Sequence, residues 1–222
     1  MSYNIEKIRQ KINECETIFF DLDGTLIDTE PLYFRFWKES ALFYGYEMSD
    51  QEALDMRSRD KEASIEALRK ISNGLLEYEA VKAKRIELMD AYLANHPIKI
   101  KSGVVEFLEK LQSENKKLYI VTANTVQKAS NIIKSLNLDR YFIDIISAKD
   151  VKRGKPYPYV YLKACEIVKI KSSDVVVFED SPNGLKSSHY AGCFTIMVED
   201  MSPFSEEMDY VDGAIKSFEE IL

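Results

Sequence analysis

Two aspartates separated by one residue form the most informative motif in the 222-residue sequence. Asp21 and Asp23 follow the apolar run Thr17–Phe20, and Gly24 and Thr25 complete an Asp-x-Asp-Gly-Thr pattern. Side chains two positions apart just past a strand project to the same side, so the two carboxylates can act on one ligand. Gly24 allows a turn that brings backbone amides near that ligand. A solvated turn at a strand end is the alternative for this motif taken alone.

Two further motifs carry groups suited to a phosphate. Thr122, Ala123 and Asn124 follow an apolar run and offer a hydroxyl, an amide and backbone donors where a helix is expected to begin. Lys155 precedes Pro156, whose rigid ring can hold the lysine toward a site rather than toward solvent. Helix capping by Thr122 and Asn124, and an ordinary surface position for Lys155, are the alternatives.

A pair of acidic residues, Glu179 and Asp180, follows the apolar run Val175–Phe178. Adjacent carboxylates suit a hard, oxygen-binding cation such as Mg²⁺, although they would also suit the start of a helix. Taken together, the four motifs would supply a nucleophile, phosphate donors, a cation and metal ligands. Phosphoryl transfer requires this set of groups.

The elements that must position these groups are short apolar runs, each ending abruptly at polar residues. Runs of this kind with little alternation are typical of strands buried on both faces of a parallel sheet. Amphipathic segments at 127–138 and 157–168 predict helices between the later strands. We therefore expect a doubly wound α/β domain whose ligand crevice lies at the carboxyl ends of the strands. The predicted strands are Thr17–Phe20, Leu118–Val121, Asp144–Ile146, Val175–Phe178, Thr195–Val198 and, more weakly, Val211–Ile215.

One interval is too long for a single crossover helix, because almost a hundred residues separate Phe20 from Leu118. Apolar residues in this interval recur at helical spacing. A first helix is predicted with Pro31 in its first turn, and further helices are predicted over Lys61–Ile71 and Glu77–Ala94. The sequence therefore predicts an α/β core formed by residues 1–29 and 96–222, preceded by a charged helical lead-in. An inserted helical domain is predicted for residues 30–95.

The four motifs resemble those of the haloacid dehalogenase superfamily, which Asp21–Thr25, Thr122, Lys155 and Glu179–Asp180 match. The helical insertion after the first motif is similar to the cap of the subgroup that holds β-phosphoglucomutases and sugar-phosphate phosphatases. The resemblance implies a Mg²⁺-dependent phosphatase that acts on a small phosphorylated metabolite. It also implies an α/β core of the doubly wound type with a cap domain.

The resemblance also implies a role for each matched residue. Asp21 would attack phosphorus and form an aspartyl-phosphate, while Asp23 would act as general acid and then general base. Mg²⁺ would be bound by the Asp21 carboxylate, the main-chain carbonyl of Asp23 and Asp180, with Glu179 beside or behind it. The phosphoryl oxygens would be held by Lys155, Thr122, Ala123 and Asn124.

Substrate selection is expected to depend on the inserted domain, where Arg57, Arg59 and Tyr33 are the candidate substrate contacts. A phosphomutase is the competing activity. Tyr33 occupies the position of the histidine that β-phosphoglucomutases carry there, and Met56 takes a glycine position, whereas Arg59 matches the mutase's phosphate-holding arginine. A catalytically idle protein on the same fold is a further alternative, and the presence of both aspartates argues against it.

Composition excludes several classes of partner. The formal net charge of −7 argues against a nucleic-acid groove, which needs a surplus of basic residues on one face. No uncharged apolar run approaches the roughly 18 residues of a membrane span, and the polar N-terminus lacks a signal-peptide core. We expect a cytoplasmic protein without a nucleic-acid, membrane or obligate protein partner. Three unpatterned cysteines are expected to be small buried apolar residues: Cys15, Cys165 and Cys193.

Overall fold

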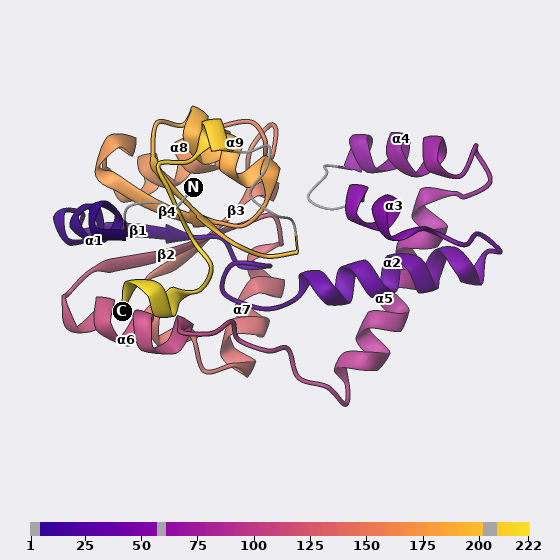
Figure 1. The fold of residues 1–222 in the computed structure, drawn as a ribbon, viewed down its shortest axis with the longest axis horizontal. Helices are drawn as coiled ribbons and strands as arrows, with labels where there is room; N and C mark the ends of the chain where they lie inside the picture. The colour runs from indigo at the N-terminus through magenta and orange to yellow at the C-terminus, as the bar shows by residue number, and fades with distance from the viewer. Residues whose placement is uncertain (1–4, 57–60, 202–207) are drawn as a thin grey trace. The chain divides into compact units, whose positions relative to one another are not determined.

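The computed structural model describes residues 5–56, 61–201 and 208–222 of the chain, which folds into two compact units (Figure 1). Residues 1–27 and 100–222 form the unit that we call the sheet unit, and residues 28–99 form the inserted unit. The chain leaves the sheet unit after Ile27 and re-enters it at Ile100, and these two residues pair in an antiparallel bridge. The inserted unit therefore interrupts the sheet unit between its first and second strands.

A parallel sheet forms the centre of the sheet unit. Within the described residues the strand order is β3-β2-β1-β4-β5-β6, which is the doubly wound order with its reversal between β1 and β4. Every residue of β1 and β4 is buried, which explains why these runs lack polar alternation. The predicted fold class is confirmed. The strands are β1 (Thr17–Phe20), β2 (Lys117–Thr122), β3 (Asp144–Ser147), β4 (Val175–Glu179), β5 (Phe194–Val198) and β6 (Gly213–Ile215).

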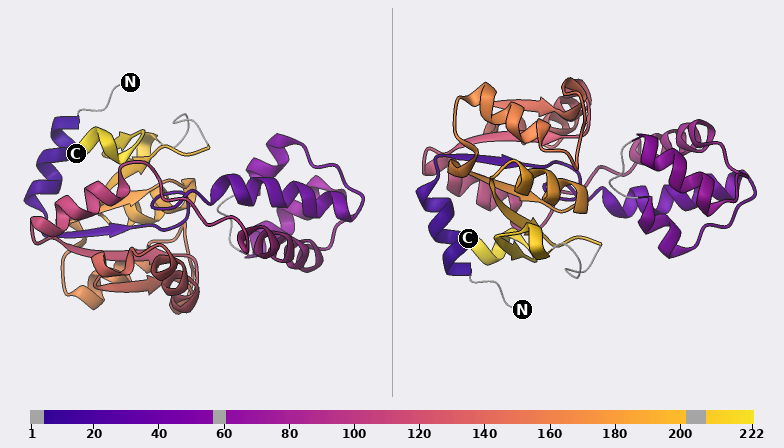
Figure 2. Two further views of the ribbon diagram at one scale, coloured as in Figure 1. Left: turned by 90° about the horizontal axis from the view of Figure 1, so that it is seen from below. Right: turned by 90° about the horizontal axis from the view of Figure 1, so that it is seen from above.

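Helices cover both faces of this sheet. In Figure 1, α8 and α9 lie on one side of the strands and α6 lies on the other, and Figure 2 shows the same layers from two further directions. The α-helices of the sheet unit are α1 (Ile5–Glu14), α6 (Val104–Ser113), α7 (Val126–Ser135), α8 (Tyr159–Val168) and α9 (Pro182–Tyr190). Short 3₁₀ turns occupy Asp139–Tyr141, Ala148–Asp150, Ser172–Asp174, Met208–Tyr210 and Phe218–Ile221.

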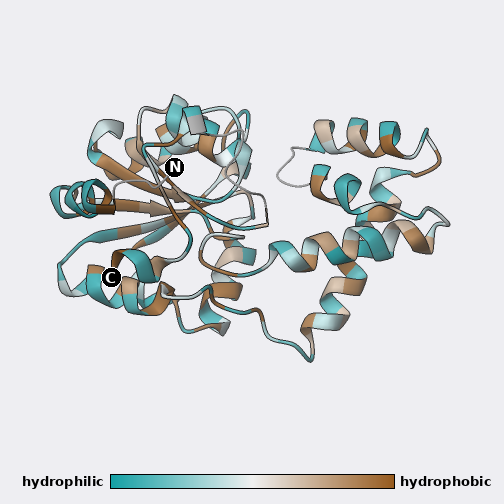
Figure 3. Ribbon diagram, viewed as in Figure 1, coloured by the Kyte–Doolittle hydropathy of each residue, from teal (hydrophilic) through white to brown (hydrophobic). Residues whose placement is uncertain are grey.

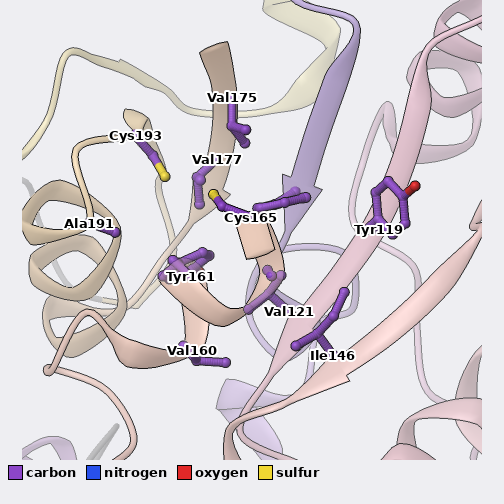
Figure 4. Packing of buried hydrophobic residues seen from close by; sticks show 12 residues of the cluster. Tyr119, Val121, Ile146, Val160, Tyr161, Cys165, Val175, Val177, Ala191 and Cys193 are labelled. Carbon is purple, nitrogen blue, oxygen red and sulfur yellow. The ribbon is translucent and has the colours of Figure 1, made fainter. Parts of the chain in front are cut away.

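Two adjacent phenylalanines of β1 show how the sheet separates two apolar layers. Phe19 belongs to a cluster that α8 completes with Val160, Tyr161 and Ala164 (Figure 4). Phe20 points to the opposite face and stacks on Phe178, with ring centroids 5.1 Å apart. Figure 3 shows the resulting distribution, with apolar strands inside and helices that are apolar on one side. Because side chains on both faces of the sheet are buried, the strands are held in position, and so are the residues at their ends.

The inserted unit is helical and has its own core around Trp37 on α2. Leu68 of α4 and Val81 of α5 pack into this core, and the guanidinium of Arg85 lies 4.5 Å from the Trp37 ring centroid. The structure agrees with the helices predicted from spacing and adds the short α3. The helices are α2 (Glu30–Phe43), α3 (Asp50–Asp55), α4 (Lys61–Ile71) and α5 (Tyr78–Leu93).

The cysteines behave as predicted from their spacing. All three are free and buried, and Cys165 and Cys193 belong to the cluster shown in Figure 4. They therefore contribute apolar packing rather than a disulfide framework. Among the helices of the described ranges, none has the length and apolar character that crossing a bilayer requires.

Candidate active site

The first motif lies where β1 ends at the reversal of strand order. Asp21 continues the pairing of the strand, because its N–H donates to the carbonyl of Phe178 at 2.9 Å. The chain then turns at Gly24, which has a φ of +82°, and Gly24 N–H donates to Ile27 O at 2.8 Å. A Cβ on Gly24 would lie 2.2 Å from Asp180 Oδ2. Glycine is therefore required here both for its backbone conformation and for the approach of Asp180.

Lys155 links the first motif to the acidic pair after β4. Its ammonium donates to Asp21 Oδ1 at 2.6 Å and to Glu179 Oε1 at 2.5 Å. All three side chains are at least nine-tenths buried. Burial by itself disfavours the charge of Lys155, but the carboxylates of Asp21 and Glu179 outweigh this effect and raise its pKa. Lys155 is therefore a buried cation and not a surface lysine.

Asp180 approaches the same position from the end of β4. Thr25, which is fully buried, donates its hydroxyl to Asp180 Oδ1 at 3.2 Å. One carboxylate oxygen each from Asp21, Glu179 and Asp180 lies within 4.8 Å of the others. Three buried carboxylates from two neighbouring strand ends thus converge on one small volume.

This group of carboxylates fits a hard divalent cation. Burial raises the pKa of Asp21 well above its ordinary value, Lys155 lowers it, and the charges of Glu179 and Asp23 raise it further. Three carboxylates lie beside one ammonium, so the group carries an excess of negative charge when the carboxylates are ionised. Oxygen donors with an excess of negative charge are what Mg²⁺ prefers in proteins. The predicted contribution of Asp23 is a main-chain oxygen, and it stays a prediction.

The second motif begins at Thr122, the last residue of β2. Thr122 is buried, and its Oγ1 accepts the N–H of Asn124 at 3.1 Å. This contact uses only an acceptor site of the hydroxyl, whose hydrogen can still be donated to a ligand. Asn124 Nδ2 donates to Asp23 Oδ2 at 2.5 Å, while Ala123 is exposed. The structure thus gives Asn124 a partner in the first motif, and phosphate binding by Thr122, Ala123 and Asn124 stays a prediction.

The three predicted substrate contacts belong to the inserted part of the sequence. Tyr33 lies on α2, packs against the core of the inserted unit and has the Arg85 guanidinium 5.0 Å from its ring centroid. Arg57 and Arg59 lie outside the described residues. The roles of all three in substrate recognition remain predictions.

Several polar contacts at the site involve residues to which the sequence gave no role. Thr25 holds Asp180, and Tyr161 of α8 donates to Glu179 Oε1 at 2.7 Å. Lys101 Nζ donates to the carbonyl of Gly24 at 2.8 Å. Burial raises the pKa of Tyr161, and the charge of Glu179 raises it further, so its hydroxyl remains a donor. Thr25 stands inside the first motif, whereas Tyr161 and Lys101 carry no signal in the sequence.

Comparison with known proteins shows the family of this chain. A sequence model of haloacid dehalogenase-like hydrolases matches residues 18–198. The chain is 31% identical over 180 residues to a phosphorylated carbohydrates phosphatase of Thermotoga maritima, with 80% of this chain and 82% of that protein covered. It is also 31% identical over 210 residues to hexitol phosphatase A of Escherichia coli, with 93% of each protein covered.

A solved structure shows the same fold. The crystal structure of a candidate β-phosphoglucomutase from Thermotoga maritima superposes with a TM-score of 0.73 at 27% identity, covering 93% of this chain and 96% of that one. Residues 18–198, which the hydrolase sequence model matches, contain the ends of β1, β2, β3 and β4, and the site residues lie at or after these strand ends. The chain therefore belongs to the haloacid dehalogenase-like hydrolase family.

Proposed function

We propose that this protein is a Mg²⁺-dependent phosphatase that hydrolyses a small phosphorylated metabolite, with a sugar phosphate as the preferred class. One observation carries the proposal. The buried carboxylate of Asp21 stands at the end of β1, 2.6 Å from the ammonium of Lys155 and beside the carboxylates of Glu179 and Asp180. Relatives that cover most of the chain support the choice, because their names describe phosphatases of carbohydrates and hexitols.

The proposed reaction has two half-reactions, each a displacement at phosphorus. In the first, an oxygen of Asp21 forms a bond to phosphorus while the bond to the ester oxygen breaks, and Asp23 gives its proton to the departing alkoxide. In the second, water forms a bond to phosphorus and loses a proton to Asp23, while the bond to Asp21 breaks and phosphate leaves. Asn124 orients the Asp23 carboxylate for both proton transfers through its hydrogen bond to Oδ2.

The remaining groups of the site hold the phosphoryl oxygens and the metal. Lys155 provides a fixed positive charge, and Thr122 provides a hydroxyl hydrogen at the neighbouring strand end. Mg²⁺ would be held by Asp21, Asp180 and the main-chain carbonyl of Asp23, with Glu179 behind it. When bound, the ion would offset the negative charge of the phosphoryl oxygens, which otherwise repel the carboxylate that attacks them.

Phosphatase and phosphomutase differ in how they treat the phosphorylated aspartate. A mutase must protect this group from water until a sugar hydroxyl arrives, and β-phosphoglucomutases have a histidine where this chain has Tyr33. A phenol with an ordinary pKa of about 10 is a poor replacement for an imidazole that titrates near neutrality. We therefore expect Asp23 to activate water, so that the phosphorylated aspartate is short-lived.

Two assays test the proposed function. A panel of phosphorylated sugars, nucleotides and other metabolites should identify at least one substrate from which the enzyme releases inorganic phosphate. Incubation with β-glucose 1-phosphate and a trace of the 1,6-bisphosphate should give no build-up of glucose 6-phosphate. Efficient conversion to glucose 6-phosphate without release of phosphate would instead identify a mutase.

A further inference from the structure

Both carboxylate oxygens of Glu179 accept hydrogen bonds from neighbouring residues, which is more than the binding of a metal ion would require. Its side chain is fully buried, and Oε1 accepts hydrogen bonds from Lys155 at 2.5 Å and from the Tyr161 hydroxyl at 2.7 Å. The other oxygen, Oε2, accepts from the hydroxyl of Ser181 at 3.2 Å and from its N–H at 3.4 Å. A Cβ on Gly184 would lie 2.0 Å from both oxygens, so only glycine leaves room for the carboxylate. The surroundings therefore fix Glu179 in one place.

Tyr161 reaches this carboxylate from a different element. It lies on α8, its ring is fully buried in the apolar cluster of Figure 4, and its hydroxyl is the polar tip of that cluster. A buried tyrosine hydroxyl needs a hydrogen-bond partner, and here the partner is the charged group that also binds Lys155. A phenylalanine would fill the same apolar space, so packing alone does not explain the hydroxyl.

The position of Lys155 depends on that of Glu179. An ammonium has three hydrogens, and those of Lys155 are directed to Asp21 Oδ1, to Glu179 Oε1 and, at 3.3 Å, to the carbonyl of Val121. Movement of Glu179 would therefore displace the cation from Asp21. Tyr161 limits this movement, because its hydroxyl binds the same carboxylate oxygen that binds Lys155.

We infer that Tyr161 is a positioning residue for phosphoryl transfer, whose hydroxyl fixes Glu179 so that Glu179 holds the ammonium of Lys155 beside Asp21. The inference rests on the proposed function and adds a residue to it. The Tyr161 hydroxyl touches neither the phosphoryl group nor Asp21 in this account, and it acts through Glu179. The ring of Tyr161 also faces Lys155, whose Nζ lies 5.4 Å from the ring centroid, and a phenylalanine would keep this contact.

The variant Tyr161→Phe removes one hydroxyl and leaves the ring. The matched control is Tyr141→Phe, because Tyr141 is also buried in the sheet unit and donates to a carboxylate, that of Glu109, at 3.2 Å. Two experiments are carried out in Mg²⁺: calorimetry gives the Kd for inorganic phosphate, and steady-state kinetics give kcat and KM for p-nitrophenyl phosphate. We expect Tyr161→Phe to raise the Kd about tenfold and to lower kcat/KM by a similar factor, as loss of a hydrogen bond to a charged group does. The control should stay within about twofold of the parent.

A second comparison tests whether the effect passes through Glu179. In a Glu179→Gln background, Tyr161→Phe should add less than about twofold to the loss, because residues that act through one contact are not additive. Melting curves of both phenylalanine variants separate a loss of stability from a loss of phosphate binding. Three results would each overturn the inference: parental phosphate affinity in Tyr161→Phe, equal losses in both phenylalanine variants, or full additivity with Glu179→Gln.

The phosphate measurement also separates this inference from the proposed function. If the parent binds phosphate but hydrolyses no ester, while Tyr161→Phe weakens that binding about tenfold, the positioning role stands and the phosphatase proposal fails. If the parent hydrolyses esters and Tyr161→Phe behaves as Tyr141→Phe does, the phosphatase stands and the positioning role fails.

Discussion

Replacing Asp21 with asparagine should lower kcat by roughly 10⁴-fold or more while the protein still folds. An amide nitrogen or oxygen is a far poorer nucleophile than a carboxylate oxygen, and the aspartyl-phosphate cannot form on it. The fold should survive because the two side chains have nearly the same shape, and an amide oxygen can still accept from Lys155, which lies 2.6 Å from Asp21 Oδ1. Steady-state turnover of p-nitrophenyl phosphate and a thermal melt measure the two effects.

A matched control for this variant is Asp212→Asn in the same unit. Asp212 also uses its carboxylate in a structural hydrogen bond, since Oδ2 accepts the N–H of Thr195 at 2.9 Å, but it lies at the start of the final strand region rather than at the end of β1. The control should keep kcat within about twofold of the parent. Turnover of Asp21→Asn near the parent rate, in a reaction that a chelator still stops, would show that Asp21 is not the nucleophile.

Removal of divalent ions should abolish turnover, and Mg²⁺ should restore it. The carboxylates of Asp21, Glu179 and Asp180 lie within 4.8 Å of one another, so without a cation they repel both one another and a phosphate ester. Ca²⁺ should not support the reaction, because its larger and more variable coordination shell does not hold the attacking and leaving oxygens in line. Turnover is measured after treatment with a chelator and after addition of each ion in turn.

The contribution of Asp180 can be tested by binding alone. Asp180→Asn should weaken Mg²⁺ binding, measured by calorimetry, by about tenfold or more, because one charged oxygen ligand becomes neutral. Asp212→Asn is again a suitable comparison, since Asp212 is an acid of the same unit whose Oδ2 accepts the N–H of Thr195 at 2.9 Å. Full turnover in excess chelator, or equal Mg²⁺ affinities in both variants, would contradict the metal site.

Much of the fold could be predicted from the sequence, because buried strands and helices require apolar residues at regular spacing. The first strand is Thr17–Phe20 in both prediction and structure, since all four of its residues are apolar or β-branched and buried on both sides. The helix Lys61–Ile71 was likewise predicted within the bounds that the structure gives. By contrast, α3 is only six residues long and is marked mainly by its capping box of Ser49 and Glu52, a signal too local to stand out.

The site could be predicted only in part, because its polar contacts depend on how the helices pack against the sheet. Strand ends identified Asp21, Lys155 and Asp180 as neighbours, since the carboxyl ends of parallel strands share one edge. Sequence spacing predicted a helix over residues 157–168, which include Tyr161, but gave no sign that its hydroxyl reaches Glu179. That contact depends on how α8 packs against the sheet. The hydrogen bond from Asn124 to Asp23 joins residues 101 positions apart and is equally invisible in sequence.

The stereochemical course at phosphorus tests most directly the claim that an aspartyl-phosphate forms and is hydrolysed. Each in-line displacement inverts the configuration at phosphorus, so a reaction through a phosphorylated enzyme gives two inversions. A phosphorothioate ester whose non-bridging oxygens are different isotopes, hydrolysed in water enriched in the third isotope, should therefore yield inorganic thiophosphate with net retention, however short-lived the intermediate is. Net inversion would show that water attacks the ester directly, and it would contradict the role proposed for Asp21.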